Sequence, residues 1–192
     1  PRYREVFEKM LRPTSDGFEV ELSYFSYMMD TRARYTERLV AALGPARDPA
    51  EPIVERHEDI AASLQAVVED LMVHLARVAR ERTGCKNLCM AGGVVLNCVA
   101  NTRVANEAGF ERCFFQPACR DAGTSAGAAL YVSHCLLGQT RNPPAVKTDY
   151  LGPSFSADEL RAELDESGLA YAELTDPAEH AAERLTRNRF LG

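Results

Sequence analysis

Long apolar runs are absent from this 192-residue sequence. No stretch approaches the roughly 20 consecutive apolar residues that a helix needs to cross a bilayer. The opening residues, PRYREVFEKM, also lack the apolar centre of a secretory signal peptide. These absences argue against a membrane partner and predict a cytoplasmic protein.

An excess of positive charge is absent as well. The chain carries 22 Lys and Arg residues against 28 Asp and Glu residues, which gives a formal net charge of −6. A field of that sign repels phosphate backbones rather than gathering them. Nucleic acid is therefore not expected as a partner.

Cysteine pairs with metal-site spacing are also missing, because the six cysteines form no CxxC pair and no zinc-type Cys/His set. Each cysteine has small or apolar neighbours, which predicts reduced, buried thiols. The six are Cys85, Cys89, Cys98, Cys113, Cys119 and Cys135. His57 and His74 have no second histidine three or four residues away, so we interpret both as surface or packing residues.

The residues that are present, 46% of them hydrophobic, can bury an ordinary core. Alternation over residues 18–25 predicts a half-buried strand, and a short helix is expected over 32–43, followed by a proline-rich loop. Apolar residues then recur every three or four positions from His57 to Thr83, the pattern of a long amphipathic helix that Gly84 ends. The apolar positions are Ile60, Leu64, Val67, Val68, Leu71, Leu75 and Val78.

After this helix, strand and helix patterns alternate. Residues 86–91 and 111–117 are predicted as strands, each followed by a glycine turn and then by a helix, over 94–108 and 122–137. This order is typical of an α/β fold with parallel pairing. Since sites in such sheets lie beyond the carboxyl ends of the strands, both turns are expected to open on the same side.

The last part of the chain shows a polar, proline-bearing linker and then signals of a second domain. Ser156 and Glu159 form a capping box at the start of a helix, residues 169–174 are predicted as a strand, and a second helix follows. So short a helix-strand-helix segment makes a poor core by itself. It therefore indicates the opening of a further domain.

Gly92 and Gly93 stand between the first of these strands and its helix, in AGGVVLN. The spacing matches neither a dinucleotide-binding GxGxxG nor a P-loop. A bare Gly-Gly turn lets an adenosine or phosphate group approach the main chain, or it is simply a tight turn without a ligand. Asn97 and Asn101 lie one helical turn apart, and either contact a ligand or cap and crosslink the core.

The second turn, RDAGTSAGAAL, combines Asp121, Gly123 and Thr124. A carboxylate beside permissive backbone and a hydroxyl suits a cation together with a phosphate. The alternative is an aspartate that caps the following helix.

Three segments resemble a known family: DGFEVELSYFSY, NLCMAGGVVLNCVANTRV and CFFQPACRDAGTSAGAALY. They are similar to the O-carbamoyltransferases of nodulation-factor and antibiotic biosynthesis. The resemblance implies an actin-like ATPase fold, related to ribonuclease H and shared with tRNA threonylcarbamoyl transferases, over residues 1–140. A linker at 141–152 and the truncated start of a YrdC-like domain at 153–192 would follow.

The same resemblance implies the chemistry. In that family carbamoyl phosphate and ATP give carbamoyl-adenylate, and the carbamoyl group passes to a hydroxyl of a small molecule beside bound iron or another divalent metal. By this resemblance Gly92, Gly93 and Asn97 match the nucleotide turn, with Asn101 beside it. Asp121 matches a metal ligand, and Gly123 and Thr124 would line the phosphate.

The sequence departs from the family in lacking its HxxxH metal motif and the nucleotide motif of its second domain. The expectation is therefore an internal piece of an enzyme roughly three times as long, inactive without the remainder of its parent chain. Two alternatives remain. One is a nucleotide-dependent kinase or a tRNA threonylcarbamoyl transferase relative on the same scaffold, and the other is a non-catalytic nucleotide-binding module.

Overall fold

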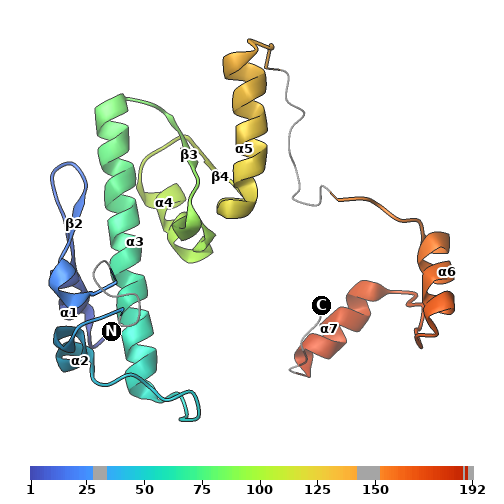
Figure 1. Cartoon of the computed structure of the whole chain (residues 1–192), viewed down its shortest axis with the longest axis horizontal. Helices are drawn as coiled ribbons and strands as arrows, with labels where there is room; N and C mark the ends of the chain where they lie inside the picture. Colours follow the sequence, from blue (N-terminus) through green and yellow to red (C-terminus); the bar gives the residue numbers. More distant parts are fainter. Residues whose placement is uncertain (28–33, 142–151, 188, 190–192) are drawn as a thin grey trace. The chain divides into compact units, whose positions relative to one another are not determined.

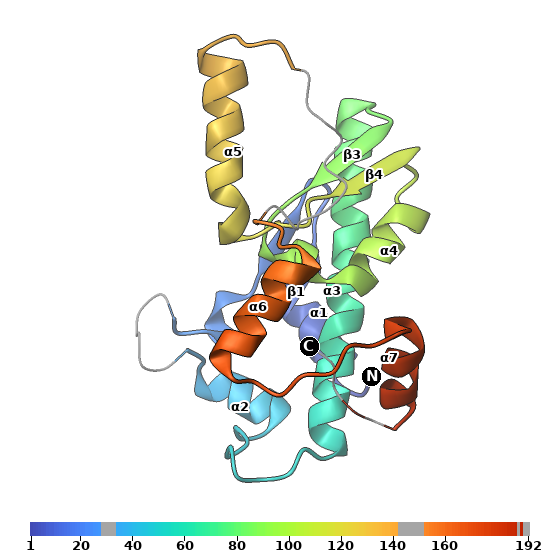
Figure 2. The ribbon, with the colours of Figure 1, turned by 90° about the vertical axis from the view of Figure 1, so that its right-hand side faces the viewer.

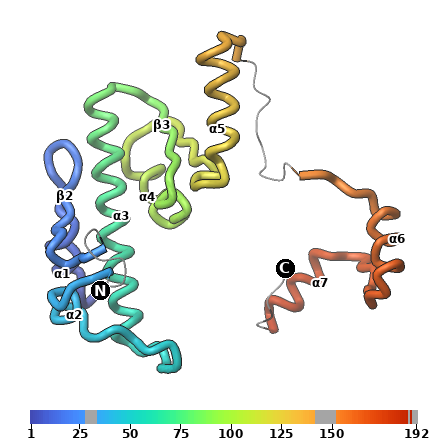
Figure 3. The backbone as a smooth tube through the Cα atoms, viewed as in Figure 1, coloured from blue at the N-terminus to red at the C-terminus, as the bar shows by residue number. Residues whose placement is uncertain are grey.

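The computed structural model describes residues 1–27, 34–141, 152–187 and 189. The chain forms two compact units, Pro1–Ala145 and Val146–Gly192, and each is described by itself (Figures 1 and 3). Most of the predicted linker at 141–152 and the first residues of the predicted helix at 32–43 lie outside the described residues. None of the described helices is both long and apolar enough to cross a bilayer.

Helix α3, Glu55–Thr83, is the longest element of the first unit (Figure 1). Its buried residues lie in the central part of the helix: Ser63, Val67, Met72, Val73 and Ala76. Of the predicted apolar positions only Val67 is among them, and Leu64 is 40% exposed. The helix ends at Gly84, which takes the left-handed conformation with φ 64° and donates its N–H to the carbonyl of Arg80 at 2.9 Å. The predicted helix and its end are confirmed, and the helix begins two residues before His57.

Against the first half of α3 lie α1 (Arg4–Met10), the 3₁₀ turn η1 (Leu22–Tyr24) and α2 (Glu37–Leu43). Their shared core is Phe7, Met10, Tyr24 and Val67. The hairpin of β1 (Leu11–Pro13) and β2 (Phe18–Val20) runs along the second half, where its turn contacts His74 and Arg82. Neither α1 nor β1 was predicted. The helix expected over 32–43 is found as α2.

The strand expected over 18–25 is wrong in its length. Strand β2, Phe18–Val20, pairs antiparallel with β1, Leu11–Pro13. The chain then leaves the sheet at η1, because the Glu21 carboxylate accepts hydrogen bonds from the N–H of Ser23 at 3.3 Å and from its hydroxyl at 2.7 Å. A local side-chain bond thus competes with the strand ladder.

The second half of α3 packs against α4, Cys98–Glu107, over two parallel strands, β3 (Asn87–Met90) and β4 (Arg112–Phe115). Both strands were predicted, and their parallel pairing confirms a mixed α/β domain. Three buried residues of α3, two of α4 and the residue that follows α4 form the core of this region: Met72, Val73, Ala76, Ala100, Val104 and Ala108.

The helix expected over 94–108 is interrupted near its start. Residues Gly93–Leu96 form a 3₁₀ turn, η2, and α4 begins only after Asn97. Beyond β4, the 3₁₀ turn η3 (Asp121–Gly123) leads into α5 (Thr124–Tyr131), which continues as a π-helical segment over Val132–Leu136. Figures 1 and 2 show α5 extending away from α3 and α4, and none of its residues is buried.

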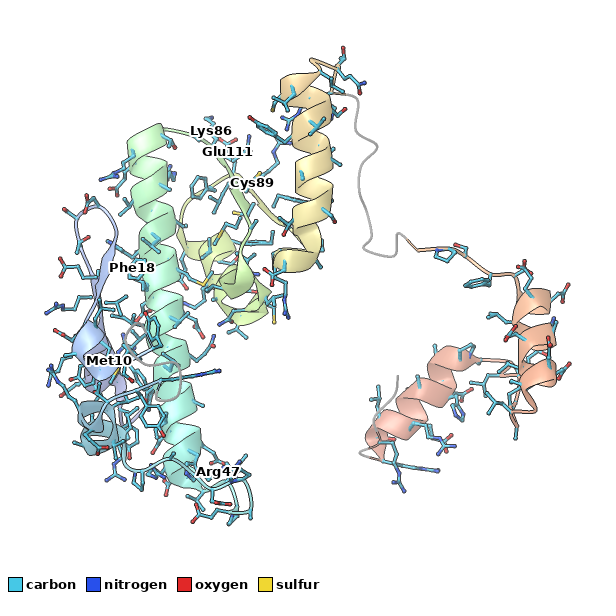
Figure 4. All side chains as sticks on the ribbon, viewed as in Figure 1. Met10, Phe18, Arg47, Lys86, Cys89 and Glu111 are labelled. Carbon is cyan, nitrogen blue, oxygen red and sulfur yellow. The ribbon has the colours of Figure 1, made fainter. Side chains whose placement is uncertain are left out.

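The prediction of buried cysteines is wrong for four of the six. Cys119 is buried and Cys113 partly so, whereas Cys85, Cys89, Cys98 and Cys135 are exposed. Cys89, labelled in Figure 4, lies opposite Phe114 in the β3–β4 ladder. Successive side chains of a strand point to opposite faces, and α3 and α4 pack against Leu88, Met90 and Phe115. Cys89 and Phe114 therefore lie on the other face, where both are exposed.

The second unit contains α6, Ala157–Ser167, and α7, Pro177–Thr186. The predicted capping box is present: the hydroxyl of Ser156 accepts the N–H of Glu159, and the carboxylate of Glu159 accepts the N–H of Ser156 at 2.7 Å. The strand predicted over 169–174 is wrong, since this segment is irregular. Its alternating pattern finds no partner strand among the described residues of the unit.

Candidate functional site

The two glycine turns lie together at one edge of the parallel strand pair. Each follows the carboxyl end of its strand, β3 or β4. The N–H of Gly92 donates to the carbonyl of Cys119 at 2.6 Å, and the N–H of Gln116 donates to the carbonyl of Met90 at 3.0 Å. These bonds join the segment of the first turn to the segment of the second, as the parallel arrangement predicts.

The two glycines of the first turn are glycines for different reasons. Gly92 has φ 112°, a conformation that residues with a side chain rarely adopt. Gly93 has no such constraint, and a Cβ added to it would meet nothing within 4 Å. The conformation of the turn explains Gly92, whereas the described packing leaves open space beside Gly93.

Asn97 caps α4 and joins it to α3. Its side-chain oxygen accepts the N–H of Ala100 at 3.1 Å and the amide of Gln65 at 3.0 Å, and its own amide donates back to Gln65 at 2.9 Å. The capping and crosslinking role that the sequence offered is therefore present for Asn97. After these contacts, one N–H of the Asn97 amide has no partner among the described residues.

Asn101 stabilises the first turn from its buried side. Its side chain is only 9% exposed, and its amide donates to the carbonyl of Val95 in η2 at 2.7 Å. Its side-chain oxygen is buried without a hydrogen-bond partner among the described residues. A buried, unpaired acceptor costs about 1–3 kcal/mol, so this oxygen is a place where a water or another donor would be accommodated.

Asp121 is exposed at the start of η3. Its main-chain carbonyl accepts the hydroxyl of Thr124 at 2.6 Å, while its carboxylate makes no hydrogen bond or ion pair with the described residues. Neither η3 nor α5 has a side-chain cap. The helix-cap interpretation of Asp121 is therefore wrong, and its carboxylate is free to bind a ligand.

Gly123 is constrained by the protein itself. A Cβ at this position would overlap the carbonyl oxygen of Ala118. The close approach of two backbone segments therefore already requires a glycine here. The predicted contact between Gly123 and a phosphate is not needed to explain this residue.

A network of charged side chains lies next to Gln65, and no sequence pattern indicated it. Arg103 of α4 contacts Asp70 at 2.7 Å and Glu69 at 3.4 Å on α3, and Glu107 on its own helix at 2.7 Å. Gln65 donates to Glu69 at 2.8 Å. The helical period places these residues on a surface, but only the packing of α3 on α4 brings them together.

The network shifts the pKa of its members. Burial, the largest single effect, raises the pKa of Asp70, but the hydrogen bonds from Arg103 and Arg4 outweigh it, so the pKa lies below its usual range. The hydrogen bond from Arg103 also lowers the pKa of Glu107. Conversely, the bonds to Glu107 and Asp70 raise the pKa of Arg103, and all these side chains stay charged near neutral pH.

The described residues contain no group of three or more His, Cys, Asp or Glu side chains arranged to hold a metal ion. Asp121 offers a single carboxylate, whereas metal sites in proteins take several ligands. The residues present therefore supply at most one ligand.

Sequence comparison with known proteins identifies the family of this chain. Residues 4–130 match the family described as Carbamoyltransferase N-terminus. Over 202 aligned residues, 100% of this chain and 33% of the relative, the sequence is 31% identical to nodulation protein NolO of Bradyrhizobium diazoefficiens. It is 35% identical to nodulation protein NolNO of Sinorhizobium fredii over 144 residues, which are 73% of this chain and 21% of that protein.

An uncharacterised protein of Synechocystis is 40% identical over 171 residues, which are 85% of this chain and 28% of that protein. The chain thus spans between about a fifth and a third of the length of these relatives. The family match includes both glycine turns and α3.

Proposed function

This chain belongs to the carbamoyltransferase family, and from that premise we propose that it forms part of an enzyme that transfers a carbamoyl group to a hydroxyl of a small molecule. The observation that carries the proposal is the joining of the two turns by the bond from Gly92 to Cys119. It places the open backbone of Gly93 and the free carboxylate of Asp121 at the same edge of the β3–β4 pair.

The proposed reaction has two steps. Water first cleaves carbamoyl phosphate to carbamate and phosphate, and the carbamate oxygen then attacks the α-phosphorus of ATP, which gives carbamoyl-adenylate and releases pyrophosphate. This step would occur in a second domain of which residues 153–192 are the proposed start. The acceptor oxygen then attacks the carbamoyl carbon, its proton leaves, and AMP departs as the C–O bond to the adenylate breaks. The resemblance of the sequence supports this route, and the parallel strands with α3 and α4 on one face are compatible with an actin-like fold.

The residues of the two turns would serve the transfer step. At Gly93 the adenylate would lie against the main chain, where the protein leaves open space. Asn97 and Asn101 would contact the nucleotide, and Gly123 and Thr124 would lie near its phosphate. The low dielectric of a closed site strengthens such contacts.

Asp121 would supply one ligand to iron or another divalent metal. When bound, the metal would polarise the carbamoyl carbonyl. The other ligands must come from outside the described residues, in which no ligand cluster occurs.

The test is an assay of the full-length protein with carbamoyl phosphate, ATP and a panel of small-molecule alcohols. Release of pyrophosphate that requires carbamoyl phosphate, followed by carbamoylation of a hydroxyl, is expected. Phosphorylation of an alcohol would instead identify a kinase, and nucleotide binding without turnover would identify a binding module. Either of these results contradicts the proposal.

Substitution of Asp121 by Asn tests the proposed role of the free carboxylate. Because this carboxylate makes no described contact, Asp121→Asn should change the free energy of unfolding by less than about 1 kcal/mol. It should lower metal content and cut carbamoyl transfer on the order of 100-fold, while pyrophosphate release continues. The matched control is Asp59→Asn, which changes a half-buried aspartate of α3. Unchanged metal content and transfer in Asp121→Asn would exclude the role.

A further inference from the structure

Gln65 has no assigned role, yet it is the side chain that holds Asn97 in place. It lies on α3, 32 residues before Asn97 in the sequence, and the two carboxamides exchange hydrogen bonds of 3.0 and 2.9 Å. Both side chains are partly buried. A reciprocal pair of this kind fixes the plane as well as the position of each amide.

Glu69 determines which way the amide of Gln65 faces. The Glu69 carboxylate only accepts hydrogen bonds when ionised, and it lies 2.8 Å from the Gln65 nitrogen. The NH₂ group of Gln65 is therefore directed toward Glu69 and toward the Asn97 oxygen, and both of its N–H bonds are used. The oxygen of Gln65 is left to accept from Asn97.

The orientation of Asn97 follows from these contacts. Its oxygen accepts two hydrogen bonds, from Ala100 and Gln65, which is the capacity of a carboxamide oxygen. Its nitrogen donates one of its two N–H groups to Gln65. Among the described contacts, the unused hydrogen-bonding capacity of Asn97 is one N–H donor.

We propose that Gln65 is a positioning residue that, aligned by Glu69, presents Asn97 beside the Gly92–Gly93 turn as a donor of one hydrogen bond. The atom that it binds must be an acceptor, such as a phosphate or ribose oxygen of the nucleotide. This inference rests on the proposed function, because it takes the turn to be a nucleotide site. It assigns the specificity of that contact to α3, outside the glycine turn itself.

The experiment measures AMP affinity of the full-length protein by calorimetry, for Gln65→Leu, Asn97→Ala and the double variant. Gln65→Leu keeps the volume of the side chain and removes the amide. It should weaken AMP binding about five- to tenfold, about 1 kcal/mol for one lost hydrogen bond. In the Asn97→Ala background the same change should have no further effect on affinity, since Gln65 acts through Asn97.

Two additional variants separate positioning from stability. Gln65→Glu keeps the acceptor but loses the donors and places a second carboxylate beside Glu69, so it should weaken AMP binding as Gln65→Leu does. The matched control, Glu81→Leu, changes an exposed residue of the same helix and should leave affinity unchanged. Thermal melts identify any variant whose loss of affinity merely follows loss of fold.

The possible results are distinguishable. If the wild-type protein binds AMP and Gln65→Leu binds it equally well, the positioning role is wrong while the proposed function stands. Equal losses from Gln65→Leu in both backgrounds would also exclude it, because Gln65 would then act independently of Asn97. If the wild-type protein binds no AMP, the nucleotide site fails and the inference fails with it.

Discussion

The two turns contain three glycines, and the structure requires a glycine at two of these positions, each for a different physical reason. Gly92 is required by a positive φ, Gly123 by a backbone oxygen that leaves no room for a Cβ, and Gly93 by neither. A glycine that the conformation and packing of the protein do not require is the one whose bare backbone calls for another explanation. A ligand contact at Gly93 is a prediction that the open space beside it allows.

Substitution of Gly123 by Ala tests the packing constraint. The added methyl group overlaps the oxygen of Ala118, so one backbone segment must move, and the free energy of unfolding should fall by about 1–3 kcal/mol. The matched control is Gly127→Ala in the interior of α5, where a Cβ meets nothing within 4 Å. Replacing a helical glycine by Ala should stabilise the protein by up to about 1 kcal/mol. Urea denaturation of both variants measures the difference, and equal effects would refute the constraint.

At the scale of elements, α3 is the common support of the first unit. Its first half packs against α1 and α2, and its second half against the β1–β2 hairpin, α4 and the β3–β4 pair. Polar contacts accompany both parts: the buried hydroxyl of Ser63 accepts the N–H of Tyr3 at 3.0 Å, and Arg103 joins α4 to α3. The turn that carries Gly93 is therefore fixed to the rest of the unit through α3.

Removal of Arg103 tests the polar connection between α3 and α4. Arg103→Met keeps much of the aliphatic stem but leaves Asp70 and Glu69 without this partner, so stability at pH 7 should fall by about 1 kcal/mol, a figure already reduced for solvent screening. Lys86→Met is the control. It breaks the pair with Glu111 visible in Figure 4, whose side chains are 74% and 62% exposed, and should have little effect.

The pH dependence of the Arg103→Met effect follows from the direction of the pKa shifts. The pKa values of Asp70 and Glu107 are lower in the folded protein than in the unfolded chain, so their contribution is present above the unfolded values of about 4. It is lost as the pH falls through the lower folded values. The stability difference between the wild-type protein and Arg103→Met should therefore shrink as the pH falls from about 5 to about 2. A difference that does not depend on pH would show that packing, not charge, is lost.

At the scale of the whole molecule, the first unit exposes apolar surface on several elements. Phe114 is 48% exposed on one face of the β3–β4 pair, and Leu130 and Tyr131 of α5 are 53% and 59% exposed. The described residues also hold no cluster of metal-ligating side chains. Both observations agree with a chain that spans a third or less of its relatives' length.

The 192-residue chain alone should therefore transfer no carbamoyl group and should bind iron weakly. Its described residues offer Asp121 without further ligands around it. The measurement is carbamoyl transfer from carbamoyl phosphate and ATP, with metal content determined in parallel. The full-length protein serves as the reference. Turnover by the 192-residue chain would show that the site lies elsewhere than at the two turns.

The sequence by itself determined the elements whose signals are local. The period of α3, its end at Gly84, the capping box of Ser156 and Glu159 and the two strands before the glycine turns were all predicted. Periodicity and capping depend on residues within one or two turns, so a single sequence contains them. The family could be identified for the same reason, because its motifs are continuous stretches around the turns.

The tertiary structure alone decided what depends on distant neighbours. The segment 169–174 alternates like a strand but has no partner, and Cys89 is apolar in context but lies on an uncovered face of a sheet. Gln65 reaches Asn97 across 32 positions, and Gly123 is needed because Ala118 approaches it. Strand pairing, burial and side-chain hydrogen bonding each need a second group whose place is set by the packing of whole elements, and a local pattern does not contain that place.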